Sequence, residues 1–139
     1  MKKELDAKLV KDFPLLYADR HKSAQETCMF WGLAVGDGWE PLIRELSEKL
    51  EPLIGKWILE NLDRKEFPPR AAQVKEKFGT LRFYMNGYCG EEIRKAIREA
   101  EEKSCVTCED CGDPGTSRSG GWYRTLCDEC EVVRQERMK

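Results

Sequence analysis

The sequence predicts an α+β fold, in which helices pack on a small antiparallel β-hairpin or sheet and a cysteine-rich unit closes the chain. Three observations support this prediction. Apolar residues recur at helical spacing in residues 42–62 and 91–104. The stretch between them, residues 74–85, alternates apolar and polar side chains as strands do. Residues 105–130 hold five of the seven cysteines and too little apolar material to fold unaided.

Length and charge limit the classes of protein to which the chain can belong. Its 139 residues suit one domain, or one domain with a small appendage. The formal net charge of −2 excludes a uniformly basic nucleic-acid coat and a polyanionic tail, but it permits a local basic patch. No apolar run approaches the ~20 residues of a membrane span. No apolar stretch typical of a secretory signal follows Met1–Asp6, so we expect a cytoplasmic protein.

The first third of the chain combines a helix, an apolar run and a turn. A weak apolar stripe at helical spacing predicts a helix near the start, and Pro14 ends it. The run Cys28–Val35 fits a buried strand, or one to two turns of buried helix. The segment Gly36–Gly38 has the composition of a turn. We expect Asp37 to cap the following helix, with Glu40 completing a capping box.

The middle of the chain predicts a long helical stretch, a hairpin and a second helix. Apolar residues at helical spacing lie on both sides of Pro52, which indicates two consecutive helices or one kinked helix. Val74–Met85 is expected to form β structure, with a turn or bulge at Gly79. Asn86-Gly87 is a second turn signal. Glu91–Ser104 has a narrow apolar stripe and acidic residues in its first turn, as expected of a helix.

Two CxxC pairs form the most specific pattern in the sequence. Together they have the spacing C-x2-C-x15-C-x2-C, which is typical of four-cysteine zinc sites. Two intervening residues let one turn present both thiolates to a single ion, and Gly112 permits the positive φ that such a turn uses. Four thiolates fill a zinc tetrahedron, so we expect structural rather than catalytic Zn²⁺. The expected ligands are Cys108, Cys111, Cys127 and Cys130.

The cysteines also leave alternatives open. They can form two disulfides or stay as metal-free thiols, although a chain without an export signal favours a metal site. Cys105 forms a third CxxC with Cys108, so a site that uses this pair is an alternative. Cys28 and Cys89 are too remote in sequence to be predicted as ligands, and we expect Cys28 to be a small core residue.

The metal site completes the predicted architecture. We expect an α+β core over residues 1–104 and a four-cysteine zinc-knuckle unit over residues 105–139, joined by the helix Glu91–Ser104. The two parts either stand apart or form one continuous domain. A short charged helix, Asp128–Met138, is expected to end the chain.

A local excess of positive charge marks the candidate contact surface. Between Arg64 and Arg82, six basic residues stand against two acidic ones, a balance of +4 in a chain whose total is −2. Aromatic residues are interleaved, and cations beside aromatic rings suit phosphate binding and base stacking. The same combination recurs around Trp122. The residues predicted to bind a ligand are Lys75, Lys77, Arg82, Tyr84, Arg118 and Arg124.

An ordered set of motifs extends over about residues 12–130. The set comprises Phe13-Pro14-x-Leu16-Tyr17, Gly36-Asp37-Gly38-Trp39 with Leu42-Ile43 and Leu46-Ser47, Val74-Lys75-Glu76-Lys77-Phe78-Gly79-Thr80-Leu81-Arg82-Phe83-Tyr84, Cys108-Glu109-x-Cys111-Gly112-x-Pro114-Gly115, and Trp122 with Thr125-Leu126-Cys127-x-x-Cys130. This set resembles small zinc-knuckle proteins of tailed phages and prophages. The resemblance implies phage origin and action in a bacterial cytoplasm, but no activity, substrate or catalytic residue. Cys105 does not match the pattern, which supports the other four cysteines as ligands.

Three functional hypotheses follow. The first is a non-enzymatic phage accessory factor that binds an anion, either nucleic acid or a nucleotide such as a defence signal, through the basic aromatic surface. In the alternative interpretation of that surface, its phenylalanines face the core and its lysines only solvate the outer face. The second is a protein–protein module, for example an inhibitor of a host enzyme or defence protein. The third is a small enzyme using His21, the only histidine, although a surface position is its ordinary role and no nucleophile motif is present.

Overall fold

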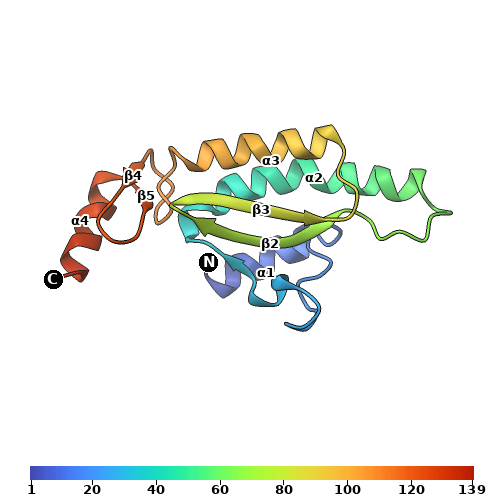
Figure 1. The fold of residues 1–139 in the computed structure, drawn as a ribbon, viewed down its shortest axis with the longest axis horizontal. Coiled ribbons are helices and arrows are strands. Elements are labelled where there is room, and N and C mark those ends of the chain that lie inside the picture. Colours follow the sequence, from blue (N-terminus) through green and yellow to red (C-terminus); the bar gives the residue numbers. More distant parts are fainter.

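The computed structural model describes residues 1–139 and has the predicted α+β class, with helices packed on small sheets (Figure 1). The molecule is elongated, and the cysteine-rich unit lies at one end. None of the helices combines the length and the apolar character needed to cross a membrane. In chain order the elements are α1 (Lys3–Asp12), the 3-10 helix η1 (Cys28–Trp31), β1 (Leu33–Ala34), the 3-10 helix η2 (Asp37–Trp39), α2 (Glu40–Glu60), β2 (Arg70–Lys77), β3 (Thr80–Asn86), α3 (Glu91–Ser104), β4 (Thr116–Arg118), β5 (Arg124–Leu126) and α4 (Asp128–Arg137).

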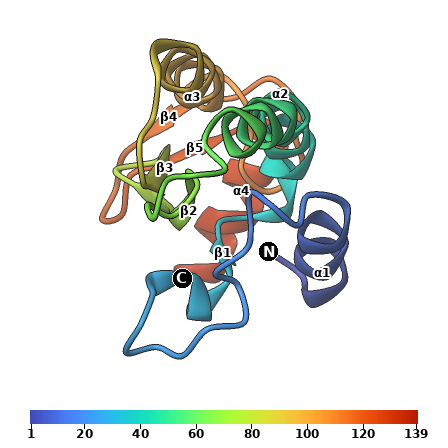
Figure 2. The same ribbon diagram turned by 90° about the vertical axis from the view of Figure 1, so that its right-hand side faces the viewer.

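The central sheet has three strands. β2 and β3 form the predicted antiparallel hairpin, and the short strand β1 adds to β2 in parallel. The pairing places Leu33, Val74 and Phe83 on one face, and all three are buried. α3 packs on β3 and α2 packs on α3, so these two helices cover that face (Figure 2). The hydrophobic core therefore lies between the sheet, α2, α3 and the N-terminal segment.

The hairpin turns through two residues with positive φ. Phe78 has φ 54° and Gly79 has φ 81°, the combination of a tight two-residue turn that matches the twist of the flanking strands. The prediction of a turn at Gly79 is confirmed. Phe78 is the only non-glycine residue of the chain with positive φ, and its side chain is 67% exposed. A bulky side chain in this region carries backbone strain.

The free edge of β3 is covered by side chains of α3. The N–H of Leu81 donates to the hydroxyl of Ser104 over 2.9 Å, and the N–H of Phe83 donates to Glu101 Oε2 over 3.0 Å. These bonds satisfy two strand N–H groups that have no neighbouring strand. α3 itself spans the predicted residues, Glu91–Ser104.

The structure corrects two of the sequence-based expectations and decides between the alternatives at Pro52 in favour of one helix. Asp37 does not cap α2: its carboxylate accepts the N–H of Lys2 over 2.8 Å, and no side chain caps the helix. Glu40 pairs instead with Arg44, one turn further on, at 2.9 Å. Pro52 lies inside a single continuous helix of 21 residues. Cys28 is exposed rather than a core residue, because the run Cys28–Val35 divides into η1 and β1 and turns this side chain to solvent.

Candidate metal centre and basic surface

The four predicted ligands come together as one cluster. The Sγ atoms of Cys108, Cys111, Cys127 and Cys130 all lie within 4.8 Å of one another. The distance between Cys111 Sγ and Cys127 Sγ is 3.6 Å. A tetrahedron with metal–sulfur bonds of about 2.3 Å has sulfur–sulfur edges of roughly 3.8 Å. All seven cysteines are free thiols, and Cys105 lies outside the cluster at the end of α3, with Sγ 3.5 Å from the carbonyl of Glu101. The cluster can therefore hold one metal ion in a site without an open position.

Local backbone features present these thiols. Cys108 and Cys111 lie in the turn that follows α3, and Gly112 adopts the predicted positive φ, 86°. Cys127 occupies the N-cap of α4, and its sulfur accepts the N–H of Cys130 over 3.4 Å. The helix N-terminus also favours a negatively charged thiolate at this position. Each CxxC pair thus uses backbone N–H groups as well as spacing to orient its sulfur atoms.

Without a cation, the four thiols cannot all be deprotonated easily, because each thiolate disfavours ionisation of its neighbours. Burial raises the pKa of Cys108, but the backbone amides of Cys127, Cys111 and Asp110 outweigh it and lower that pKa to about 7. The amide of Asp113 lowers the pKa of Cys111, but burial and the neighbouring thiols raise it to about 11. Burial, followed by the same neighbours, raises the pKa of Cys130. A bound cation offsets the repulsion between neighbouring thiolates, so that all four cysteines can bind it in the deprotonated form.

The turn before α2 forms a seat for the first CxxC pair. The N–H of Gly38 donates to the carbonyl of Glu109 over 2.7 Å, and the N–H of Gly36 donates to Glu109 Oε2 over 2.9 Å. A Cβ atom on Gly38 would lie 2.3 Å from the carbonyl oxygen of Cys108, so only glycine fits. The buried indole of Trp39 donates to the carbonyl of Thr107 over 2.8 Å. Sequence analysis missed this seat, because the Gly-Asp-Gly pattern signals a turn but not what packs against it.

The hairpin tip makes a second contact with the cysteine-rich unit. The hydroxyl of Thr125 donates to the carbonyl of Gly79 over 2.7 Å, and the indole of Trp122 donates to Glu76 Oε1 over 3.2 Å. A Cβ atom on Gly79 would lie 3.0 Å from the Cα of Arg124. The cysteine-rich unit thus contacts both the turn before α2 and the tip of the β2–β3 hairpin.

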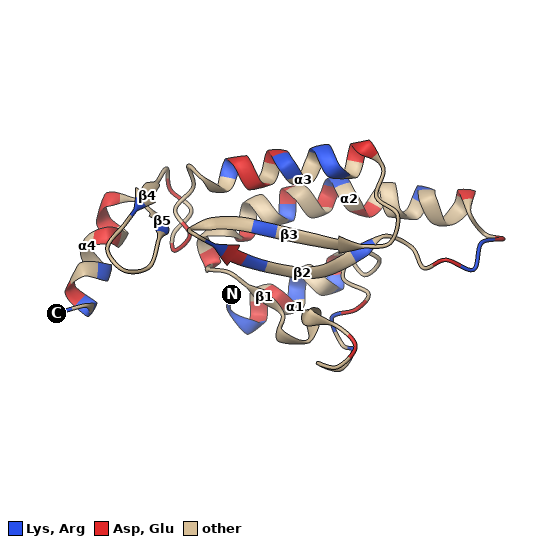
Figure 3. Cartoon of the chain, viewed as in Figure 1, with Lys and Arg blue, Asp and Glu red and all other residues tan.

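Four of the six predicted ligand-binding residues share the outer face of the hairpin. Lys75 pairs with Arg82 across the strands, Lys77 pairs with Thr80, and Tyr84 pairs with Gln73. These pairs alternate with the core residues of both strands, so their side chains point away from α2 and α3. Figure 3 shows the basic bands on β2 and β3. We call the set formed by Lys75, Lys77, Arg82 and Tyr84 the outer hairpin face.

The basic residues of this face have no counterion. No carboxylate lies within 4.0 Å of Lys75, Lys77 or Arg82. The acid between the two lysines, Glu76, is turned away and accepts the N–H of Gly79 and the indole N–H of Trp122. The face therefore presents uncompensated positive charge.

Arg118 and Arg124 differ from the other four. Arg118 lies on β4, and its Nη2 is 2.7 Å from Asp128 Oδ1. Arg124 lies on β5, and its Nη2 is 2.7 Å from Asp110 Oδ1 and 3.4 Å from Glu109 Oε1. Both arginines thus direct their charge to carboxylates of the cysteine-rich unit rather than to the outer hairpin face.

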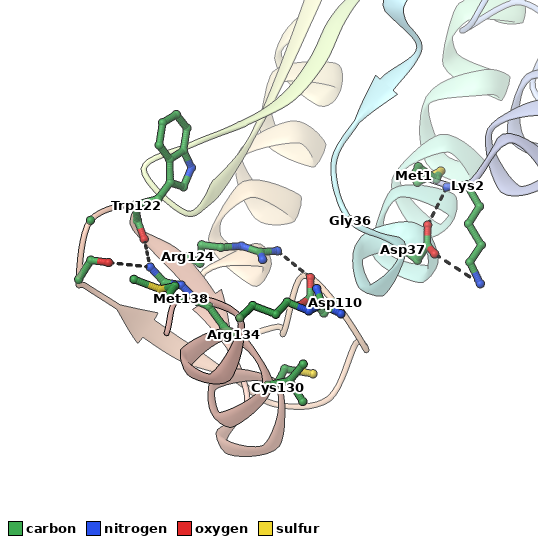
Figure 4. Close-up of a pocket in the computed structure, with 14 residues that line it drawn as sticks. Met1, Lys2, Gly36, Asp37, Asp110, Trp122, Arg124, Cys130, Arg134 and Met138 are labelled. Carbon is green, nitrogen blue, oxygen red and sulfur yellow. Dashed lines mark hydrogen bonds and ion pairs between the residues drawn. The ribbon is translucent and has the colours of Figure 1, made fainter.

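A cleft of about 960 Å³ lies between the cysteine-rich unit and the start of the chain (Figure 4). Its positive groups are mostly compensated. Lys2 lies 3.8 Å from Asp37, and Arg124 pairs with Asp110 as described. Arg134 pairs with Glu131 and donates to the carbonyls of Gly120 and Trp122, which fixes the loop between β4 and β5. Although this cleft is large, the outer hairpin face, whose cations have no counterions, is the better candidate for an anion site.

His21 lies on the surface, as its ordinary role predicts. Its side chain is exposed, makes no hydrogen bond or ion pair, and lines a cleft of about 630 Å³ together with Trp31 and Lys3. The aspartate of that cleft, Asp6, is bound by Arg20 and by the N–H of Leu33. The geometry thus gives His21 neither a nucleophile nor an orienting carboxylate.

Comparisons of this chain with known protein families, curated proteins and solved structures find no match.

Proposed function

We propose that this chain is a zinc-stabilised, non-enzymatic protein that binds an anionic ligand, a nucleic acid or a nucleotide, on the outer hairpin face. One observation carries the proposal. Lys75 and Arg82 lie directly opposite each other, and neither they nor Lys77 has a carboxylate within reach. Like charges in such a cross-strand pair destabilise a sheet. An anion bound between them would convert this repulsion into two attractive contacts.

Arg82 strengthens the argument. Its Nε atom is buried and has no hydrogen-bond partner, although a buried donor without a partner costs on the order of 1–3 kcal/mol. A phosphate oxygen is a good acceptor for a guanidinium group, since the planar fork of arginine matches phosphate geometry. Because Nε has almost no exposed surface, a ligand would bind the Nη atoms of the same guanidinium, which have no partner in the protein.

The aromatic residues of the same region point to a ligand with a planar ring. Phe78 is exposed at the hairpin tip in spite of its strained φ, and Lys77 Nζ lies 5.7 Å from the centre of its ring. Tyr84 is 44% exposed at the other end of the face. Strain that persists at an exposed position is a sign of function rather than of packing.

Zinc is the metal that best fits the cysteine cluster, because four thiolates in a closed tetrahedron are typical of structural zinc. Apart from its contacts with the seat and the hairpin tip, the cysteine-rich unit has few buried side chains. α4 buries none of its residues, and β4 and β5 bury only Thr125 and Leu126. The proposed role of the ion is to hold this unit against the hairpin tip and the seat at Gly36–Gly38.

The sequence resemblance suggests where the protein acts. We propose that the protein is a phage accessory factor that acts in the cytoplasm of a bacterial host, where its ligand would be a nucleic acid or a nucleotide used in defence. Arg118 and Arg124 remain part of the proposed contact surface only if the ligand can exchange with their carboxylate partners.

A charge-reversal experiment tests the ligand site. We expect the double variant Lys75→Glu/Arg82→Glu to bind a labelled single-stranded oligonucleotide at least about tenfold more weakly in fluorescence anisotropy. The slope of log K against log salt should fall by roughly 1.4, since two phosphate contacts are lost. The control Lys8→Glu/Lys65→Glu changes the net charge equally at exposed positions without ion pairs. If the hairpin double variant binds like the wild type, this function is wrong.

A second candidate function, binding to a partner protein, rests on one exposed aromatic pair. Phe30 and Trp31 are 44% and 71% exposed, and their rings meet edge to face at 5.0 Å. Aromatic residues of this kind are enriched at the centres of protein interfaces. This function predicts binding that survives moderate salt and is lost in Trp31→Ala, whereas phosphate binding should weaken steeply as salt rises.

A further inference from the structure

A further cavity lies beside the free edge of β3, next to the end of the outer hairpin face that carries Tyr84. It measures about 540 Å³ and lies between β3, the Gly87 turn and α3. Tyr84 lines it together with Tyr88, whose ring is 65% exposed. The apolar side chains that line the cavity include Phe83, Met85 and Ile97. Tyr84 therefore belongs both to the basic face and to a hollow with aromatic walls.

Two arginines of α3 add positive charge to this cavity. Arg98 Nη2 lies 2.9 Å from Glu91 Oε1, and Arg94 Nε lies 3.9 Å from Glu91 Oε2. One exposed carboxylate is thus shared by two guanidinium groups, which leaves an excess of one positive charge. Exposed ion pairs of this kind are worth about 0–1 kcal/mol, so a phosphate can compete for either arginine.

From this arrangement we infer that the ligand is a single strand of nucleic acid several nucleotides long, and that the Tyr84–Tyr88 cavity stacks one of its bases. This inference rests on the proposed function of the outer hairpin face. Exposed aromatic rings recur along one path, first Phe78 at the tip, then Tyr84, then Tyr88. Lys77, Lys75 and Arg82 lie between the first two rings. Rings for bases and cations for phosphates in alternation are what single-strand platforms provide.

Length excludes a mononucleotide as the full occupant of this path. From Thr80, beside the turn that holds Phe78, to Tyr84 the strand runs four residues, which corresponds to roughly 14 Å. A strand that keeps a rise of about 3.4 Å per nucleotide covers that distance with about four nucleotides. A duplex fits less well, because its bases are already stacked on each other and cannot stack on exposed rings.

Stacking variants separate this inference from the proposed function. We expect Tyr88→Ala to weaken binding of a ten-nucleotide oligo-dT by roughly 5- to 150-fold with no change in melting temperature, and Tyr88→Phe to restore it. Tyr123→Ala removes another exposed tyrosine ring, 51% exposed, from the cysteine-rich unit and should change nothing. Oligo-rU of the same length tests whether RNA or DNA is preferred, and binding of either supports the inference.

Several results would overturn it. If Tyr88→Ala binds normally while Lys75→Glu/Arg82→Glu does not, the basic face binds an anion but the cavity is no base site. The same conclusion follows if dinucleotide, inorganic triphosphate or a ten-base-pair duplex binds as tightly as the single strand. If neither variant changes binding, the inference and the proposed function both fail.

Discussion

The hydroxyl of Ser104 accepts the backbone N–H of Leu81 over 2.9 Å, so the last residue of α3 closes the free edge of β3. Both residues are fully buried. One face of the strand is thereby available to the core and the other to solvent, while its edge cannot pair with another chain.

Removal of the Ser104 hydroxyl should destabilise the fold. Ser104→Ala leaves the buried N–H of Leu81 without an acceptor, and we expect the free energy of unfolding to fall by about 1–3 kcal/mol. Ser117→Ala is the matched control, since Ser117 is exposed and makes no side-chain hydrogen bond. Denaturant unfolding of the two variants provides the measurement, and equal stabilities would show that the Ser104 bond contributes nothing.

A methyl group at Gly38 should separate the cysteine-rich unit from its seat. Its Cβ would lie 2.3 Å from the carbonyl oxygen of Cys108, so Gly38→Ala is expected to cost about 1–3 kcal/mol or more. At Gly55, inside α2, the nearest atom is 3.8 Å away, and Gly55→Ala should stabilise the helix by about 0.5–1 kcal/mol. Opposite signs of the two changes in unfolding free energy are the expected result; a neutral Gly38→Ala would contradict the described seat.

The hairpin tip should show a conflict between stability and binding. Phe78→Asn places a residue that tolerates positive φ before Gly79, so we expect a gain of about 0.5–1 kcal/mol in unfolding free energy. The same change removes an exposed ring and should weaken binding of oligo-dT about fivefold or more. Thermal melting and anisotropy on one preparation test both halves. A variant that is more stable and also binds normally would show that Phe78 has no role in binding.

Metal removal should unfold the cysteine-rich unit. We expect one zinc per chain in purified protein, and its loss to a strong chelator should remove stabilisation on the order of 10 kcal/mol from residues 105–139. Cys127→Ser should fail to retain zinc, whereas Cys105→Ser, outside the cluster, should retain one ion per chain. Elemental analysis with circular dichroism checks this prediction, and full zinc content in Cys127→Ser would refute the ligand set.

The ion pair between α2 and α3 should make a small contribution that depends on pH. The hydrogen bond from Lys103, 2.8 Å long, and then its charge lower the pKa of Glu45. A lowered carboxyl pKa stabilises the fold above the pKa of the unfolded chain, and this stabilisation is lost as the pH falls through the folded pKa. Glu45→Gln should therefore lower the melting temperature at pH 7 by at most about 3 °C, and by less in acid.

Glu48→Gln is the control for this pair, since Glu48 is exposed on the same helix and makes no ion pair. It should melt like the wild type at both pH values. A Glu45→Gln deficit that stays the same from pH 7 to pH 3 would mean that the Lys103 contact is not its source.

Sequence patterns predicted the features that are determined by residues close together in the chain. The narrow stripe of Glu91–Ser104 gave the helix with its bounds, and the cysteine spacing gave the cluster, because both are set within a few residues of backbone. The local excess of basic residues likewise predicted Lys75 and Arg82 as parts of one contact surface, and the two residues pair across the strands. These signals need no knowledge of the distant chain.

Contacts between distant segments account for what the sequence did not reveal. Asp37 has the residue type and position of a helix cap, but Lys2 binds it, 35 residues away. The seat at Gly36 depends on Glu109, 73 residues further along the chain. Arg118 and Arg124 look like their basic neighbours in sequence, and only the fold reveals the carboxylates that neutralise them. No periodicity encodes such partners.

The seat at Gly36–Gly38 also governs how the protein can be divided. A fragment ending at Ser104 would strip the acceptors from three N–H donors, those of Gly36, Gly38 and the Trp39 indole. It would also uncover the carbonyl of Gly79 at the hairpin tip. Such a truncated protein would expose these unpaired polar groups beside the large indole of Trp39, so expression trials should keep residues 105–139 attached.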